Sequence, residues 1–350
     1  MIPAVVLAVD GGNSKTDLAL VRSDGALLSH VRGPLSSPHH LGLAGCVELL
    51  QGLLDDAIAT ARLERNGRRV AEVAGVFLAG VDFPAEERRL QEAVEERGWA
   101  TRTMVGNDTF AVLRAGTAKG WGVAVVCGAG INCVGVAPDG RHLRFPALGA
   151  ITGDWGGGYD VGLAALSAAA RSEDGRGPST SLERAVPRHF RLETPLELAE
   201  AIHGGRIANR RLIELAPVVF AEADRDAVAA GIVERLTAEV VALARVAITR
   251  LGLGGEPVEV LLGGGLMRAG DGRLLGSIED GLRGVGERIV VRRTASPPVV
   301  GAALLGLDAL GAGEEARERA REELGAAADS DDELTGVGQT GTHDGRNGDG

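Results

Sequence analysis

The stretch Asp10-Gly11-Gly12-Asn13-Ser14-Lys15-Thr16 directly follows an apolar run over residues 4–9. Strand-forming residues resume at 17–22, so the glycines are expected to close a hairpin and not to open a helix. A hairpin excludes both a Walker A loop and a Rossmann turn, because each of those leads into a helix. Glycines let the backbone approach an anion closely and turn its N–H groups toward it. The stretch therefore predicts a strand-turn-strand motif that binds nucleotide phosphates, the plainer alternative being a tight hairpin turn.

Asp10 ends the first predicted strand and is the candidate residue for a metal ion. Mg²⁺ favours one or two carboxylates together with phosphate oxygens, and it keeps several of its waters. We therefore expect Asp10 to hold Mg²⁺ through water.

The bulk composition is that of a globular protein. The chain has 350 residues, of which 45% are hydrophobic and 24% charged, enough for two domains with cores of their own. Its net charge of -11 argues against a nucleic-acid surface as the main function. No signal peptide opens the chain, and no apolar run approaches the ~18 residues that a membrane span requires. We expect a cytoplasmic protein without nucleic-acid or membrane partners.

The end of the chain and the three cysteines are expected to have no catalytic role. Residues 312–350 hold eleven acidic residues and four arginines, a net charge of -7 (4 minus 11), without apolar periodicity. This acidic tail is therefore expected to be disordered. Cys46, Cys127 and Cys133 are too scattered for a disulfide framework or a metal site, so we interpret them as reduced thiols.

The opening of the chain and the segment from residue 121 share one pattern. Each consists of strand, glycine turn, strand, Asp-Gly turn and strand, and the two copies lie about 118 residues apart. Such a duplication predicts two mononucleotide-binding halves with a cleft between them. The first copy has strands at 4–9, 16–22 and 27–32, with Ser23-Asp24-Gly25 as its second turn; the second copy has strands at 121–127 and 133–137, with Gly128-Ala129-Gly130-Ile131-Asn132 and Pro138-Asp139-Gly140 as its turns.

A catalytic carboxylate is expected at Asn107-Asp108, where a predicted strand over 102–105 ends and a helix starts near Thr109. Phosphoryl transfer needs a phosphate cradle, Mg²⁺ and a carboxylate that accepts the proton of the attacking hydroxyl. Asp108 is the candidate for this general base. An aspartate at this place could equally be the N-cap of the helix. The residues alone leave both roles open.

Two further glycine clusters follow downstream. Gly153-Asp154-Trp155-Gly156-Gly157-Gly158-Tyr159 precedes a predicted helix over 160–170, and Asp154 could bind a polyol hydroxyl or stabilise the turn. Gly263-Gly264-Gly265 follows a predicted strand over 258–262. This cluster could let a nucleoside lie against the backbone, or it could be an ordinary strand-to-helix turn.

The order of these motifs over residues 4–310 resembles the actin, Hsp70 and sugar-kinase superfamily. Within it, the chain is similar to the BadF/BadG/BcrA/BcrD-type ATPase group that includes N-acetylglucosamine kinase. The resemblance implies two ribonuclease-H-like α/β domains of the actin-like ATPase type, with mixed sheets around a nucleotide cleft. It implies domains over residues 1–116 and 117–298, with a closing helix over 299–310 that packs on the first. A homodimer is compatible with the resemblance, although no residue pattern indicates one.

The resemblance also implies roles for single residues. Asp108 matches the general base of the kinase and Asp154 a sugar-binding aspartate. ATP and Mg²⁺ are the implied cofactors, with an amino sugar as the small-molecule partner and Asp10 at the metal. The residues implied to bind ATP are Asp10, Gly11, Gly12, Asn13, Ser14, Lys15, Thr16, Gly128, Ala129, Gly130, Gly263, Gly264 and Gly265, and those implied to bind the sugar are Asn132, Gly153, Asp154, His39 and His40.

Two departures from the family pattern concern the sugar. An Asn-His-Trp-like stretch of the kinase is replaced here by Ser36-Ser37-Pro38-His39-His40, whose histidines could face the sugar or simply be exposed in a loop. The Gly-Asp-Glu-Gly pattern appears as Gly153-Asp154-Trp155-Gly156, which loses a carboxylate. The expected function is ATP-dependent phosphorylation of an amino-sugar hydroxyl. The first candidate reaction is the conversion of N-acetylglucosamine to its 6-phosphate. N-acetylmuramic acid and glucosamine are the alternative substrates.

Two other classes of function are weighed against a kinase. An ATP-driven activator that passes electrons from an iron–sulfur cluster would need cysteine thiolates, and no cluster pattern is present. A non-catalytic sensor of sugar or nucleotide is left open by the altered sugar stretch and by Trp155. Both rank below the kinase.

Overall fold

The computed structural model describes residues 5–63, 69–255, 257–270, 272–286 and 288–337. The chain divides into two compact units. The first unit contains the residues up to 111 together with those from 296 onward, and the second contains residues 112–295. Helix α3 (Asp108–Gly116) begins in the first unit and ends in the second.

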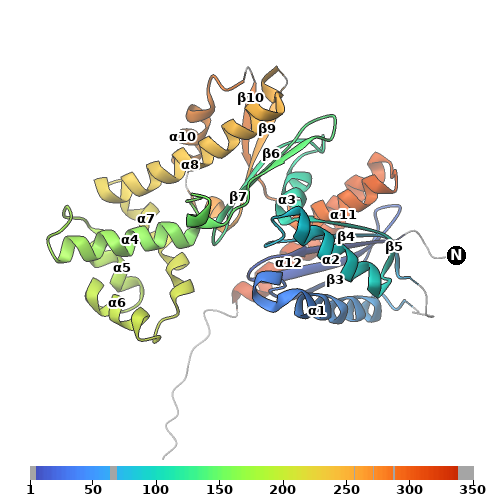
Figure 1. Ribbon diagram of the computed structural model, residues 1–350, viewed down its shortest axis with the longest axis horizontal. Helices are drawn as coiled ribbons and strands as arrows, with labels where there is room; N and C mark the ends of the chain where they lie inside the picture. Colours follow the sequence, from blue (N-terminus) through green and yellow to red (C-terminus); the bar gives the residue numbers. More distant parts are fainter. Residues whose placement is uncertain (1–4, 64–68, 256, 271, 287, 338–350) are drawn as a thin grey trace, which may run out of the picture. The chain divides into compact units, whose positions relative to one another are not determined.

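The first unit is built on a five-stranded mixed sheet, which Figure 1 shows in colours from dark blue to teal. Strands β1, β2 and β3 form an antiparallel meander, and β4 and β5 then add in parallel beside β1. The strand order is therefore β3-β2-β1-β4-β5. The strands are β1 (Val5–Gly11), β2 (Lys15–Arg22), β3 (Leu27–Pro34), β4 (Ala71–Leu78) and β5 (Ala100–Asn107).

Both faces of this sheet are buried, which explains the continuous apolar run of β1. Val5, Leu7 and Val9 point to the face covered by α1 (Pro38–Thr60) and α2 (Pro84–Arg97). Val6 and Ala8 point to the opposite face, which α11 (Pro298–Ala309) and α12 (Glu314–Val337) cover. Burying each Leu or Val side chain stabilises the fold by roughly 1.5–3 kcal/mol, so the two layers hold the sheet from both sides.

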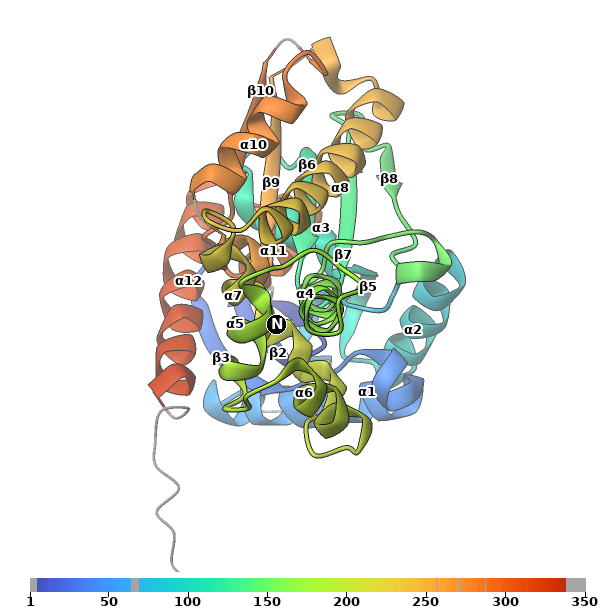
Figure 2. The same ribbon diagram turned by 90° about the vertical axis from the view of Figure 1, so that its left-hand side faces the viewer.

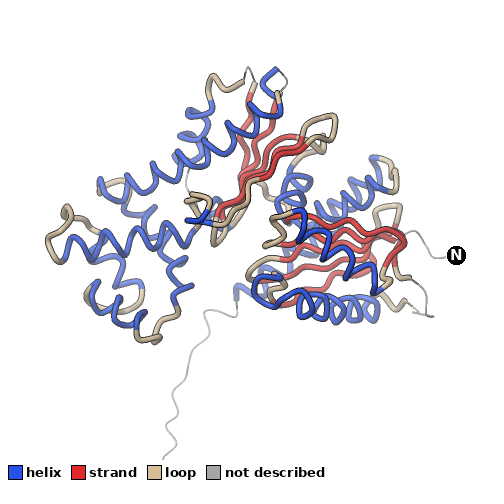
Figure 3. The backbone as a smooth tube through the Cα atoms, in the orientation of Figure 1, coloured by secondary structure: helices blue, strands red, loops and turns tan. Residues whose placement is uncertain are grey.

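The second unit repeats the topology of the first. Its strand order is β10-β9-β6-β7-β8, with β6, β7 and β8 antiparallel and with β9 and β10 parallel to β6 (Figure 3, strands in red). Gly25 and Gly140, in the two Asp-Gly turns, adopt φ values of 84° and 86°. The predicted duplication is thus present in the topology. The strands are β6 (Gly122–Cys127), β7 (Ile131–Val136), β8 (His142–Arg144), β9 (Val258–Gly263) and β10 (Ile289–Arg293).

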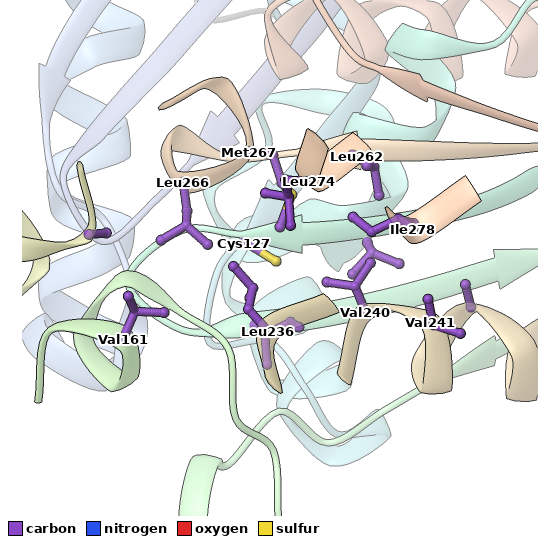
Figure 4. Close-up of a cluster of buried hydrophobic side chains, with 14 of the residues drawn as sticks. Cys127, Val161, Leu236, Val240, Val241, Leu262, Leu266, Met267, Leu274 and Ile278 are labelled. Carbon is purple, nitrogen blue, oxygen red and sulfur yellow. The ribbon is translucent and has the colours of Figure 1, made fainter. Parts of the chain in front are cut away.

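Helices form a large layer on one face of the second sheet. In the longest of them, α8, Asp226 caps the first turn by accepting from the N–H groups of Val228 and Ala229. Gly252, in the left-handed region, follows the last helical residue. Figure 4 shows Cys127 of β6 among apolar side chains of this layer. The helices are α4 (Gly158–Glu173), α5 (Leu182–His189), α6 (Pro195–His203), α7 (Ala216–Glu222), α8 (Ala227–Leu251), α9 (Gly265–Ala269) and α10 (Gly272–Leu282), with 3₁₀ helices at Gly149–Ile151, Asn209–Leu215 and Leu253–Gly255.

The expectation of a disordered tail was wrong for residues 314–337, which form α12. A stripe at every fourth position, Ala316, Ala320, Leu324 and Ala328, is buried against the first unit. Three of these four residues are alanines, whose small apolar surface is hidden in sequence by the surrounding charges. Glu, Arg and Ala are good helix formers, and Arg319 pairs with Glu323 one turn on at 2.6 Å. The rest of the acidic tail, residues 338–350, lies outside the described residues.

Among the described residues, no helix combines the length and the apolar character that a membrane crossing requires.

Replacing Leu324 by Ala tests whether α12 is part of the folded core. Leu324 is fully buried, so the change is expected to lower the free energy of unfolding by about 2–4 kcal/mol, measured by urea unfolding. Leu41→Ala is the matched control in the same unit, because Leu41 is 39% exposed. An equal, small effect of both changes would contradict a packed α12.

Candidate active site

The hairpin between β1 and β2 is closed by the backbone and leaves its tip exposed. The Gly12 N–H donates to the Lys15 carbonyl at 2.8 Å, and Asn13 and Ser14 are exposed between them. At Gly11 a Cβ atom would lie 2.1 Å from Ser36 Oγ and 2.4 Å from Leu78 Cδ2, so only glycine fits. A short, exposed glycine hairpin of this kind can present N–H groups to an anion.

Thr16 does not share this exposure. Its side chain is fully buried, and its hydroxyl donates to the Pro34 carbonyl at 2.7 Å. The hydroxyl therefore ties β2 to the end of β3. Its expected phosphate contact is replaced by a structural one.

Asp10 and Asp108 form a pair of half-buried carboxylates in the first unit. Burial, followed by the charges of Asp108 and Asp17, raises the pKa of Asp10 well above its usual value, although Lys15 and Arg32 lower it. Burial and the neighbouring Asp82 carboxylate raise the pKa of Asp108 to about 7. Perturbed carboxylates of this kind are typical of functional sites.

Asn107 resolves part of the ambiguity about Asp108. Its side-chain oxygen accepts from the Thr109 N–H at 3.0 Å and from the Thr109 hydroxyl at 2.6 Å. Asn107 therefore caps α3, and Asp108 stands at the first helical position, where backbone N–H groups of Asp108 and Thr109 partly lower its pKa. The capping role is filled by its neighbour, so Asp108 is available for chemistry.

Asp82 and Glu86 lie beside the candidate residues Asn107 and His39 and were not predicted from the sequence. Asp82 accepts from the Asn107 side chain at 2.9 Å, and Glu86 accepts from the Asp82 and Phe83 N–H groups at 2.9 and 3.0 Å. His39 lies 3.7 Å from Glu86, and the ligand atoms of His39, Asp82 and Glu86 all lie within 4.8 Å of one another. The position of Asp82 just beyond a buried strand was the one available signal.

The stretch expected as a loop at Ser36–His40 is different in the structure. Pro38 is the first residue of α1, because proline is well suited to the first turn of a helix. Ser36 and Ser37 are fully buried, whereas His39 and His40 are exposed in the first turn. The structure brings His39 to Asp82 and Glu86, and no contact described for His40 joins it to them.

The glycine turn of the second unit is packed against the start of α4. The Gly158 and Tyr159 N–H groups donate to the Gly128 and Ala129 carbonyls at 2.8 and 3.0 Å. At Gly157 a Cβ atom would lie 2.2 Å from the Ala129 carbonyl oxygen, which requires glycine. Ala129 and Gly130 are exposed at the tip of the turn, so this turn can also present backbone to an anion.

Asn132 and Asp154, the expected sugar residues of this unit, are held by local hydrogen bonds. The Asn132 side chain accepts from the Cys133 N–H at 2.7 Å. Asp154 accepts from the Thr152 hydroxyl, and its N–H donates to the Gly149 carbonyl, while Gly153 supplies a φ of 83° for the turn. Both side chains are half-buried. At the position where the family pattern has a glutamate, Trp155 stacks under Arg235 at 4.1 Å.

Gly264 brings the β9–α9 turn against the end of β6. It has a φ of 91°, and a Cβ atom there would lie 2.2 Å from the Cys127 carbonyl oxygen. Gly263 is buried against Val112, and Gly265 is exposed as the first residue of α9. The backbone of this turn therefore lies close to the end of β6, and Gly264 and Gly265 form its exposed side.

The three cysteines are buried and free. Burial raises the pKa of the Cys46 thiol to about 12 and also raises the pKa values of the Cys127 and Cys133 thiols. Cys46 belongs to a core of the first unit, and the other two belong to the core of the second. Such thiols are not available as thiolate ligands of a metal cluster.

The carboxylates of the first unit fit a magnesium ion. Burial, followed by the charge of Asp108, raises the pKa of Asp10, and a bound cation would favour the charged carboxylate. Carboxylate oxygens with nearby phosphate oxygens are the donors that Mg²⁺ prefers. Asp10 is therefore a suitable residue for this ion.

Three comparisons place the chain among known proteins. The model of the BadF/BadG/BcrA/BcrD ATPase family matches residues 7–306. A curated N-acetylmuramic acid/N-acetylglucosamine kinase of Clostridium acetobutylicum is 28% identical over 216 residues, which is 61% of this chain and 69% of that protein. An N-acetyl-D-glucosamine kinase of Dictyostelium discoideum is 25% identical over 230 residues, 64% of this chain and 72% of that protein.

A solved structure agrees with these sequence matches. A Chromobacterium violaceum protein, named as a candidate N-acetylglucosamine kinase, superposes with a TM-score of 0.69 at 26% identity. The match covers 87% of this chain and 100% of that chain. The α/β architecture with mixed sheets, expected from the family resemblance, is confirmed, and each of the two sheets has five strands.

The raised pKa of Asp108 predicts that its charge destabilises the fold. The folded state holds the Asp108 proton more tightly than the unfolded state does. The contribution of Asp108 to the free energy of unfolding therefore falls as the pH rises from about 4 to about 7. Above pH 7, Asp108→Asn is expected to raise the free energy of unfolding by about 1–3 kcal/mol. Urea unfolding at pH 5 and pH 8 measures this, with exposed Asp56→Asn as control. A less stable Asp108→Asn variant at pH 8 would contradict the assignment.

Proposed function

The chain belongs to the BadF/BadG/BcrA/BcrD ATPase family, and on that premise we propose that it is an ATP-dependent kinase for an amino sugar. N-acetylglucosamine is the first candidate substrate, because proteins named as N-acetylglucosamine kinases recur among the relatives. Its 6-hydroxyl is the proposed acceptor.

The observation that carries the proposal is the raised pKa of Asp108. A general base works best when its pKa lies near the working pH, and the pKa of Asp108 is raised to about 7. Asn107 caps α3 in its place, which leaves the carboxylate for the substrate. Its neighbour Asp82 is oriented by the Asn107 side chain.

The proposed step transfers one phosphoryl group and one proton. Asp108 accepts the proton of the sugar hydroxyl, whose oxygen forms a bond to the γ-phosphorus of ATP. The bond between the γ-phosphorus and the bridging oxygen to ADP breaks, and its electron pair leaves with ADP. The reaction is largely a matter of position and charge, because phosphoryl transfer asks little covalent chemistry of the protein.

The other residues receive roles that match their exposure. In the first unit, exposed Asn13 and Ser14, together with Lys15 and the Gly12 backbone, are proposed to bind phosphate. In the second unit, Gly128–Gly130 are proposed to bind phosphate and Gly264–Gly265 the nucleoside. Asn132, Gly153, Asp154 and His39 are proposed to bind the sugar. Thr16 and Gly263 support these segments from within, since both are buried.

Magnesium, held by Asp10 through water, would neutralise phosphate charge during transfer. Asp10, one residue before the end of β1, is held in place by its sheet pairing with Asp17 on β2. We also propose a cytoplasmic location, where ATP is available. A homodimer stays a prediction from the family resemblance.

The competing functions are less well supported. The buried thiols do not fit an electron-transferring activator with an iron–sulfur cluster, because cluster ligation needs accessible thiolates. A sensor that binds without catalysis would not need a carboxylate with a pKa near 7. N-acetylmuramic acid is the substrate alternative favoured by one relative, the Clostridium acetobutylicum kinase that is named for both sugars.

A sugar panel tests the proposed reaction. ADP release with Mg-ATP is expected to be stimulated at least tenfold by N-acetylglucosamine and less by glucosamine, N-acetylmuramic acid, N-acetylmannosamine or glucose. A stronger response to N-acetylmuramic acid would change the substrate and keep the kinase. A flat response from protein that binds ATP would replace the kinase by a sensor.

Asp108→Asn tests the general base. Removing a positioned base is expected to lower kcat by about 10²- to 10⁴-fold, because the sugar hydroxyl then has no proton acceptor. The Kd of ATP, measured by calorimetry, is expected to change little. Asp56→Asn is the control, and near-normal turnover of Asp108→Asn would remove the assignment.

The pH profile tests the titration of the same group. The carboxylate must be unprotonated to act, so kcat/KM is expected to fall about tenfold per pH unit below about pH 7. Asp82→Asn removes the neighbouring charge and should move the midpoint to lower pH while keeping an acceptor for the Asn107 amide. A midpoint that Asp82→Asn leaves in place would show that another group limits the rate.

A further inference from the structure

A histidine and two carboxylates of the first unit meet where α1 and α2 begin. The ligand atoms of His39, Asp82 and Glu86 all lie within 4.8 Å of one another. His39 is in the first turn of α1, Asp82 precedes α2, and Glu86 is in the first turn of α2. Helices α1 and α2 lie side by side, as Figure 2 shows, so side chains from both reach one place.

The two carboxylates of this cluster are oriented by hydrogen bonds from the chain. Glu86 Oε2 accepts from the N–H groups of Asp82 and Phe83 at 2.9 and 3.0 Å, and Glu86 Oε1 lies 3.7 Å from His39 Nε2. Asp82 Oδ1 accepts from the Asn107 side chain at 2.9 Å. The carboxylates are therefore positioned by the fold, whereas the half-exposed His39 ring can adjust to a ligand.

A buried hydroxyl beside the cluster is a second, independent indication of a polar ligand. Ser37 is fully buried, and its Oγ has no hydrogen-bond partner among the described residues. A Cβ atom built on Gly80 would lie 2.8 Å from Ser37 Oγ and 3.1 Å from His39 Cγ, so the hydroxyl and the ring both lie against Gly80. Buried hydroxyls nearly always have a partner, so this one indicates a polar group that the described part of the chain does not supply.

The donor types and their separations fit a zinc ion. Zn²⁺ binds imidazole nitrogen and carboxylate oxygen at about 2.0–2.2 Å in a tetrahedron, which places neighbouring ligand atoms about 3.4 Å apart. The 3.7 Å between His39 Nε2 and Glu86 Oε1 is close to that spacing. The 4.8 Å limit for the whole cluster exceeds it by about 1.4 Å, which rotation of these partly exposed side chains can close. Imidazole favours Zn²⁺ over Mg²⁺, whose usual ligands are oxygen atoms.

We propose that His39, Asp82 and Glu86 bind a zinc ion, with water as its fourth ligand. The ion links the start of α1 to the start of α2. Of the residues proposed for the kinase reaction the site uses only His39, and zinc on Nε2 excludes a contact of that nitrogen with the sugar. The site goes beyond the proposed function, and it stands even if no sugar is phosphorylated, because zinc binding is measured without ATP or sugar.

Calorimetric titration of the full-length protein with Zn²⁺, with Mg²⁺ in excess, tests the proposal. His39→Ala is expected to raise the Kd of zinc at least tenfold, because losing a ligand costs no less than losing a residue that orients one. His40→Ala is the matched control, since His40 is exposed in the same turn of α1, and it should leave the Kd unchanged. An unaltered protein that binds no zinc, or a His39→Ala protein that binds it equally well, would overturn the proposal.

Glu86→Gln tests the same site from α2. Glutamine keeps a side-chain oxygen for the Asp82 and Phe83 N–H groups, so the start of α2 is expected to persist. Loss of the carboxylate charge should nevertheless raise the Kd of zinc at least tenfold, whereas Glu92→Gln, at an exposed position of the same helix, should not change it. Unchanged zinc affinity of Glu86→Gln would place the ion elsewhere and overturn the proposal.

Urea unfolding gives a second measurement of the same ion. A ligand that binds the folded state better than the unfolded state stabilises it, so zinc should raise the unfolding midpoint of the unaltered and His40→Ala proteins. It should not raise the midpoint of His39→Ala. An equal rise in all three proteins would contradict binding at His39.

Discussion

The constraint on which the first unit depends is the cost of holding carboxylates together with little solvent. Asp10 lies one residue before the end of β1 and Asp108 directly follows β5 of the same sheet, and each ionises only against burial and a like-charged neighbour. Such a carboxylate destabilises the fold in its ionised form, so its presence indicates a function that uses the charge. A phosphoryl-transfer site is a natural use, because both a metal ion and a proton acceptor require carboxylates at that place.

The surrounding structure limits this cost without removing it. Asn107 caps α3, so Asp108 is not consumed by the helix terminus. Asp17, a third carboxylate, is paired separately with Arg32 and faces His30, whose other ring nitrogen lies 3.1 Å from Asp331 of α12. Asp17 is thus permanently paired, whereas Asp10 and Asp108 can respond to ligands.

The segments that form the candidate site were easier to predict from the sequence than the contacts that their side chains make. The glycine turns, the strand end at Asn107-Asp108 and the duplicated strand pattern were all readable, because backbone constraints on glycine and strand periodicity are local. Thr16 was expected to meet phosphate and instead bonds Pro34, since which way a hydroxyl faces depends on the register with β3. The helix α12 was missed because its buried stripe is mostly alanine within a charged sequence. Asp82 and Glu86 were missed because the His39 cluster joins α1 to the turn before α2.

The sequence by itself determined where the backbone must turn tightly and which acids stand at strand ends, and with the family resemblance it indicated ATP-dependent sugar phosphorylation. Only the tertiary structure decided which of those acids carries a raised pKa, which residue caps α3 and which charges oppose Lys15. The physical reason is that turns and alternation are fixed by neighbours along the chain. Desolvation and Coulomb interaction instead depend on groups that the sheet brings together from distant positions, such as Asp17 of β2 and Asp331 of α12.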